Sequence, residues 1–173
     1  MKNVFSGILN TIVVVSMVTI PAIVYAQQQE QKDLLQKHEE AHCLAQNIYF
    51  EARGSNFADK VSVADVVINR SLDRRYPATI CDVVRQGNTD ANGNMIRNQC
   101  QFSWYCDGKS DEATNVDAWE EAMLIAWQMV EYGRYRGLTE GATHYHATYV
   151  DPYWTKDMQQ VGRIGAHVFY RWE

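Results

Sequence analysis

Residues 41–54 read AHCLAQNIYFEARG, and the prediction of the fold starts from this stretch. Apolar residues recur in it at helical spacing, which predicts a helix over residues 39–53 that Gly54 ends. Glu51 lies about 80° around this helix from the centre of the apolar stripe, beside the core face rather than opposite it. Desolvation there favours the protonated carboxylic acid, the state that a general acid needs. Glu51 is therefore a candidate catalytic residue, and the alternative is a salt bridge with Arg53 or Arg70.

The segments that follow predict two more helices. Asn56 is placed to cap a helix whose apolar face begins at Phe57, with Asp59 in the first turn and Pro77 as the stop. We expect a short helical piece near residues 80–85, a polar loop over residues 87–99, and a third helix that begins near Asp117 and ends at Gly133 or Gly137.

Towards the C-terminus the pattern changes from helical spacing to alternation. Residues 142–150 and 163–171 are rich in Thr, Tyr, Val and Phe, which predicts two strands that pair. The predicted fold class is α+β: a helix-rich single domain with a small antiparallel β-sheet.

The N-terminal 26 residues differ in composition from the rest of the chain. Lys2 precedes an uncharged apolar run that extends from Phe5 to Ala26 and that Pro21 interrupts. This order is typical of a secretory signal peptide, and the alternative is an uncleaved membrane anchor. We expect a signal peptide over residues 1–26, a polar spacer over residues 27–40 and a catalytic domain over residues 41–173.

The composition and the cysteines narrow the class of protein. The chain has 173 residues, is 46% hydrophobic and carries a formal net charge of −5, which argues against disorder and against nucleic-acid binding. An even number of cysteines in an exported chain favours disulfides. Three pairings are open, and the short segment between Cys100 and Cys106 favours that bridge together with Cys43–Cys81. The thiols are too dispersed in the sequence for a typical zinc site.

Several motifs resemble the SleB-type cell wall hydrolases, the family of spore cortex-lytic enzymes. The resemblance follows the predicted domain in order: residues 43–45, 48–54 (IYFEARG), 63–70 (VADVVINR), 77, 80–84 (ICDVV), 100–104 (CQFSW), 141–146 (GATHYH), 152–154 and 164–170 (IGAHVFY). It implies a distantly lysozyme-like fold and cleavage of the bond between N-acetylmuramic acid and N-acetylglucosamine. It also implies that Glu51 is the catalytic residue. The chain has no visible peptidoglycan-binding repeat, and its paired cysteines look like those of relatives in Gram-negative bacteria and phages, so a preference for spore cortex is not implied.

Cortex-lytic members of that family are lytic transglycosylases, in which one glutamate is both acid and base. Retaining and inverting glycosidases need a second carboxyl group. Four residues are conceivable, and no motif singles one out, which favours the transglycosylase: Asp65, Asp82, Asp107 and Asp151. No cofactor is expected, and we expect a monomer, exported to the periplasm or secreted, that meets a membrane only through an uncleaved signal segment.

Further residues are candidates for contacts with the glycan. They are Gln101, Ser103 and Trp104 after the polar loop, and Tyr145, His146 and Trp154 on the opposite wall. Phe102 is expected in the core, whereas Trp104 and Gln101 each have a structural role as the alternative to a glycan contact. Asn69 and Arg70 are expected to brace the helix that carries Glu51. A second hypothesis is a zinc amidase or peptidase built on His144, His146 and His167. A third is a wall-binding module without catalysis.

Overall fold

The computed structural model describes residues 4–173, with side chains from residue 21 onwards. Helix α1 (Val4–Ala52) contains Pro21 and continues through it, because one proline removes only a single helical hydrogen bond. Most of the predicted signal peptide lies outside the residues with described side chains. Within the described part of the chain, no helix is long and apolar enough to span a bilayer. The chain divides into two units, each held by its own internal contacts: residues 1–37 and a compact domain, His38–Glu173.

Helix α2 (Phe57–Leu72) runs through the centre of this domain, and its Val63, Val66 and Val67 are fully buried. Asn56 caps it as predicted, because its side-chain oxygen accepts the N–H of Asp59 at 3.0 Å. Two details of the prediction for this helix were wrong. Phe57 is 48% exposed, since the first residue of the helix extends past the packed core. The helix also ends at Leu72, well before Pro77, where the chain turns at Asp73.

The C-terminal end of α1 is fixed to α3 (Ile80–Val84), the short helix that the sequence predicts. Cys43 and Cys81 form a disulfide between the two helices, as expected. The Glu40 carboxylate accepts the N–H groups of Ile80 at 2.6 Å and Cys81 at 3.2 Å, which satisfies two free donors at the start of α3. The end of α1 is thus held covalently and by hydrogen bonds.

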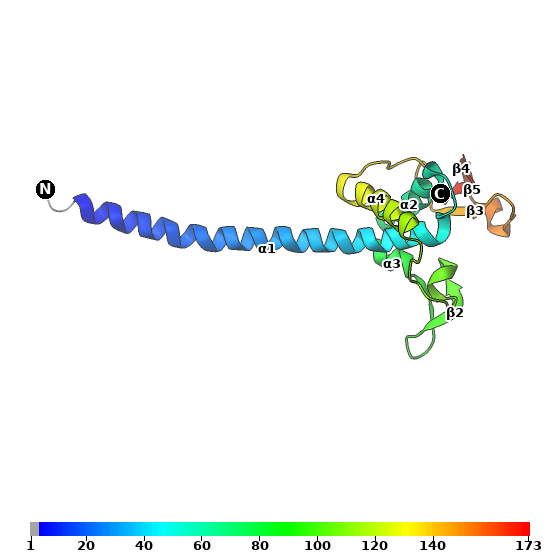
Figure 1. Cartoon of the computed structure of the whole chain (residues 1–173), viewed down its shortest axis with the longest axis horizontal. Helices are drawn as coiled ribbons and strands as arrows, with labels where there is room; N and C mark the ends of the chain where they lie inside the picture. Colours follow the sequence, from blue (N-terminus) through cyan, green and yellow to red (C-terminus); the bar gives the residue numbers. More distant parts are fainter. Residues whose placement is uncertain (1–3) are drawn as a thin grey trace. The chain divides into compact units, whose positions relative to one another are not determined.

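The segment predicted as a polar loop is a two-stranded hairpin, so that prediction was wrong. Strands β1 (Gly87–Thr89) and β2 (Met95–Cys100) pair antiparallel, and most of their residues are exposed (Figure 1). Because neither face is buried, the strands lack the apolar alternation by which a strand is recognised. A 3₁₀ helix, η1 (Ser103–Cys106), follows, and the predicted Cys100–Cys106 disulfide ties it back to β2.

Helix α4 (Val116–Tyr132) buries Ala122, Ile125, Ala126 and Met129 against α1 and α2. The helix begins next to Asp117, as predicted, and Asn115 caps it, because the Asn115 side chain accepts the N–H of Ala118 at 2.9 Å. Gly133 ends the helix in the left-handed conformation (φ 62°), which favours glycine.

The sheet at the C-terminus has three antiparallel strands in the order β3-β5-β4: β3 (His144–Ala147), β4 (Gln159–Ile164) and β5 (His167–Arg171). A second 3₁₀ helix, η2 (Tyr153–Asp157), precedes β4. The predicted pairing of the two segments is confirmed, but residues 163–171 are two strands rather than one. Gly165 (φ +55°) turns the chain between them. The domain is α+β, as predicted.

Candidate active site

Glu51 occupies the last turn of α1, where the helix meets the three-stranded sheet. Its side chain is half-buried, and the Tyr145 hydroxyl of β3 donates a hydrogen bond to its Oε2 at 3.2 Å. Burial raises the pKa of Glu51, whereas this hydrogen bond and the charges of His167 and Arg70 lower it. The residue is thus a sheltered acid whose carboxylate form also has stabilising neighbours.

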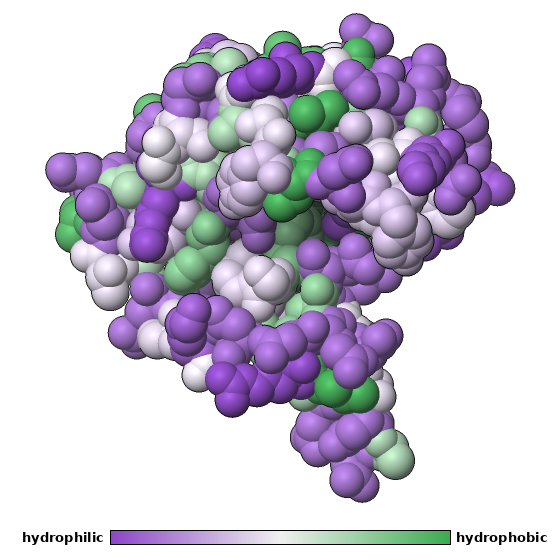
Figure 2. All heavy atoms as spheres, turned by 90° about the vertical axis from the view of Figure 1, so that its right-hand side faces the viewer, coloured by the Kyte–Doolittle hydropathy of each residue, from purple (hydrophilic) through white to green (hydrophobic). Residues whose placement is uncertain are grey.

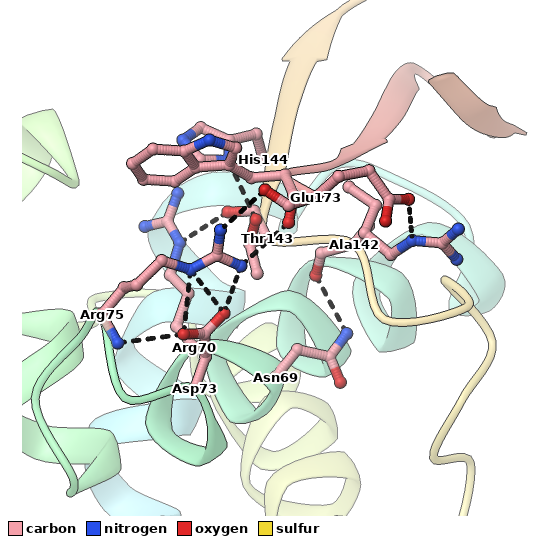
Figure 3. Close-up of polar contacts among 10 residues, drawn as sticks. Asn69, Arg70, Asp73, Arg75, Ala142, Thr143, His144 and Glu173 are labelled. Atoms are coloured by element: carbon pink, nitrogen blue, oxygen red, sulfur yellow. Dashed lines mark hydrogen bonds and ion pairs between the residues drawn. The ribbon is translucent and has the colours of Figure 1, made fainter. Parts of the chain in front are cut away.

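Neither arginine that could have neutralised Glu51 is seen in a salt bridge with it in the described part of the chain. Arg53 donates to the Tyr49 hydroxyl at 3.1 Å and lies over that ring. Arg70 is 5% exposed, and its Nε donates to the Thr143 carbonyl at 2.7 Å. Figure 3 shows Arg70 and Asn69 reaching from α2 to the backbone at residues 142–143. Arg70 therefore braces the start of β3, whereas bracing of the helix that carries Glu51 was predicted, and it influences Glu51 through its charge.

The molecular face on which α1 ends is hollowed. Figure 2 shows a recess with apolar residues on its floor, and the β1–β2 hairpin projects below it. Gln101 and Ser103, which follow β2, are exposed. Trp104 is only 8% exposed, because it stacks on Phe50 at 4.7 Å and its Nε1 donates to Asn47 at 3.3 Å. Trp104 thus belongs to the core, with Phe102, and leaves little ring surface for a sugar.

The structure separates the residues proposed for the opposite wall. Alternate residues of a strand face opposite sides of its sheet. Tyr145 faces Glu51, whereas His146 lies on the other side, with its Nε2 3.1 Å from the Tyr170 hydroxyl. Trp154 packs beside it, 5.8 Å from the His146 ring and 5.4 Å from the Tyr170 ring. The expectation that Tyr145, His146 and Trp154 share one wall is therefore wrong.

The same alternation disfavours the zinc hypothesis. His144 and His146 share one face of the sheet, and His167 pairs with Ala147 on the face that carries Tyr145. The three imidazoles therefore do not converge. Within the described residues, no group of three or more His, Cys, Asp or Glu side chains has the geometry to hold a metal ion.

One pair near the site was not predicted. Asp59 in the first turn of α2 is fully buried, and its Oδ1 lies 2.7 Å from Nδ1 of His167 in β5. Asp59 was recognised only as a favourable residue near a helix N-terminus. Its partner lies more than one hundred residues later, so no local pattern connects the two. The resemblance of residues 164–170 to a family motif was the available signal.

None of the groups that shift the pKa of Glu51 is a carboxylate, within the described residues. Asp65, the most buried of the four candidates, accepts hydrogen bonds from Arg136 at 2.9 Å and from the Gly137 and Thr139 N–H groups. It is therefore a structural residue that fixes the loop before β3. A cavity of about 420 Å³ between α1 and α4 is lined by His42, Gln46, Asp111, Glu112, Ala113 and Trp119, away from Glu51.

Comparison with known proteins finds one matching family model and two similar solved structures. The family model described as cell wall hydrolase matches residues 54–170, beginning just after the turn that carries Glu51. The structure resembles the catalytic domain of the germination-specific lytic transglycosylase SleB from Bacillus anthracis, with a TM-score of 0.56 and 22% identity over 76% of this chain and 93% of that one. It also resembles the SleB catalytic domain from Bacillus cereus, with a TM-score of 0.53 and 23% identity over 76% and 89%. No curated protein matches the sequence.

Proposed function

The chain belongs to the cell wall hydrolase family, and from this premise we propose that it is a lytic transglycosylase that cleaves peptidoglycan glycan strands, with Glu51 as its acid and base. The observation that carries the proposal is the setting of Glu51. Burial favours its protonated form, and Tyr145 is placed to stabilise the carboxylate that remains after proton transfer.

The reaction needs one group that gives up a proton and takes one back. Protonated Glu51 donates its proton to the oxygen between N-acetylmuramic acid and N-acetylglucosamine, and the bond from that oxygen to C1 breaks. The 6-hydroxyl of the same muramyl residue then bonds to C1 and passes its proton to the Glu51 carboxylate. The product is a 1,6-anhydro ring, and no water is consumed.

The surroundings of Glu51 support this route over hydrolysis with two carboxylates. Such hydrolysis needs a second carboxyl group about 5–9.5 Å from the first. The groups that shift the pKa of Glu51 are Tyr145, His167 and Arg70, none of which is a carboxylate in the described structure. Gln101 and Ser103, which are exposed and follow β2, are proposed to contact the glycan.

Two disulfides and a wall substrate support an exported protein, because disulfides persist in oxidising compartments. A cleaved signal peptide over residues 1–26 and a final location in the periplasm or outside the cell are part of the proposal.

Digestion of purified sacculi tests it. We expect the wild-type protein to release 1,6-anhydromuramyl products, each lighter by one water than the hydrolysed product. Glu51→Gln should fold and release none, and Glu120→Gln, on the exposed side of α4, is the matched control. Products with reducing ends only would establish hydrolysis instead. Wild-type activity in Glu51→Gln would refute the role of Glu51, and sacculus binding without lysis by the wild-type protein would favour the non-catalytic module.

A further inference from the structure

A buried Asp59–His167 pair lies on the face of the sheet that carries Tyr145. Asp59 is fully buried and His167 is 8% exposed. Asp59 Oδ1 lies 2.7 Å from His167 Nδ1, and its Oδ2 accepts the N–H of Ala166 at 3.3 Å. One carboxylate therefore fixes both the β4–β5 turn and the orientation of the imidazole that follows it.

The imidazole of His167 contacts the phenol that binds Glu51. The imidazole packs edge-on against the Tyr145 ring, with 5.1 Å between the ring centroids and 78° between the ring planes. Strands β3 and β5 are neighbours in the sheet, and their register places Tyr145 and His167 on one face (Figure 1). A continuous line of contacts thus runs from Asp59 through His167 and Tyr145 to Glu51, and it connects α2, β5, β3 and the end of α1.

We propose that Asp59 and His167 are positioning residues, which hold Tyr145 and a positive charge against Glu51 so that this residue can both release and recover a proton. The inference rests on the proposed function of Glu51. It adds two residues that lie outside the contacts expected for the substrate.

The physical argument concerns the carboxylate form of Glu51. Burial on its own would make this form too costly, and an acid that cannot lose its proton cannot act. Three neighbours lower the pKa of Glu51 and so oppose the effect of burial: Tyr145 from β3, His167 from β5 and Arg70 from α2. Arg70 is always charged. His167 is the neighbour whose orientation depends on another buried carboxylate, because Asp59 binds its Nδ1.

The test is the pH profile of kcat/KM on soluble glycan strands, measured for His167→Gln and Asp59→Asn. In His167→Gln, loss of the nearby positive charge favours protonated Glu51, so the descending limb should move to higher pH by about one unit. Asp59→Asn removes a negative charge together with the partner that orients the imidazole, so the limb should move less in this variant. KM should stay near the wild-type value, because both residues are buried, whereas kcat should fall. The matched control is His42→Gln, which removes an exposed imidazole of α1 and should leave the profile unchanged.

A purely structural role would lower the unfolding free energy and leave the descending limb at the wild-type pH, and that result would overturn the inference. Asp59→Asn keeps an acceptor for the Ala166 N–H. If His167→Gln does not fold, a lower kcat with an unchanged KM in Asp59→Asn tests the positioning role, and a wild-type kcat would overturn it. Carbon-13 NMR titration of Glu51 in the wild-type protein is an independent measurement. We expect a higher pKa of Glu51 when the same measurement is made on His167→Gln, and an equal pKa in the two proteins would also overturn the inference. Activity in Glu51→Gln would instead indicate that the proposed function itself is wrong.

Discussion

The two disulfides should contribute unequally to stability, because they close loops of very different length. Cys43–Cys81 spans 38 residues and Cys100–Cys106 spans 6. If a disulfide stabilises by restricting the unfolded chain, these loop lengths correspond to about 3.9 and about 2.2 kcal/mol at 25 °C. The double variant Cys43→Ala/Cys81→Ala should therefore lose about 1.7 kcal/mol more unfolding free energy than Cys100→Ala/Cys106→Ala.

Urea unfolding followed by tryptophan fluorescence measures both losses, with the oxidised wild-type protein as the reference. The slope of free energy against urea should be compared as well, since a change in slope indicates a change in the unfolded chain. The burial of Cys43 and Cys81 adds to the expected difference, because alanine leaves small voids at both positions. An equal loss in the two variants, or a larger loss for the Cys100–Cys106 pair, would refute the reasoning from loop length.

Three further predictions concern the site and the turn behind it. Tyr145→Phe removes the hydroxyl that donates to Glu51, so the pKa of Glu51 should rise. Because this hydrogen bond is long, at 3.2 Å, kcat should fall only about tenfold. An unchanged pH profile would contradict this prediction. Glu51→Gln should unfold at higher urea than the wild-type protein at neutral pH. The raised pKa makes stability fall as pH rises above 4.5, so this advantage should disappear below that pH, and an advantage that persists there would argue against burial as its cause. Gly165→Ala places a Cβ 2.7 Å from Asp59 Cγ at a positive φ, and should cost about 2 kcal/mol or more in unfolding free energy, whereas Gly162→Ala, with open space around it, is the control.

The features that follow from local periodicity and capping could be predicted from the sequence. The end of α1, the Asn56 cap, the short α3 and the glycine that ends α4 are set by residues within a few positions of one another. The β1–β2 hairpin was missed because its strands bury neither face, and the Gly165 turn was missed because apolar residues flank it on both sides. In each case the determining feature was exposure or backbone conformation, which composition does not report.

The candidate site likewise has one part that the sequence predicts and another part that depends on the tertiary structure. The spacing of the apolar stripe put Glu51 at the edge of the core, and the structure finds it half-buried. Which residues face it is decided by strand register, and a shift of one residue exchanges the faces. Tyr145 and His146 are adjacent in sequence but lie on opposite sides of the sheet, and Asp59 meets His167 only through the packing of α2 on β5.

The position of Glu51 in the last turn of α1 has one more consequence. Burial is the main influence on its proton, but the peptide dipoles of a helix also place partial negative charge at the C-terminal end. A carboxylate there is disfavoured by roughly 0.3–1 kcal/mol at low ionic strength, and α1 has no basic residue in that turn to offset the effect. The backbone of α1 therefore helps to keep the Glu51 carboxyl group protonated. Because dissolved ions screen this contribution, the enzyme should work over a slightly wider alkaline range in dilute buffer than in concentrated salt.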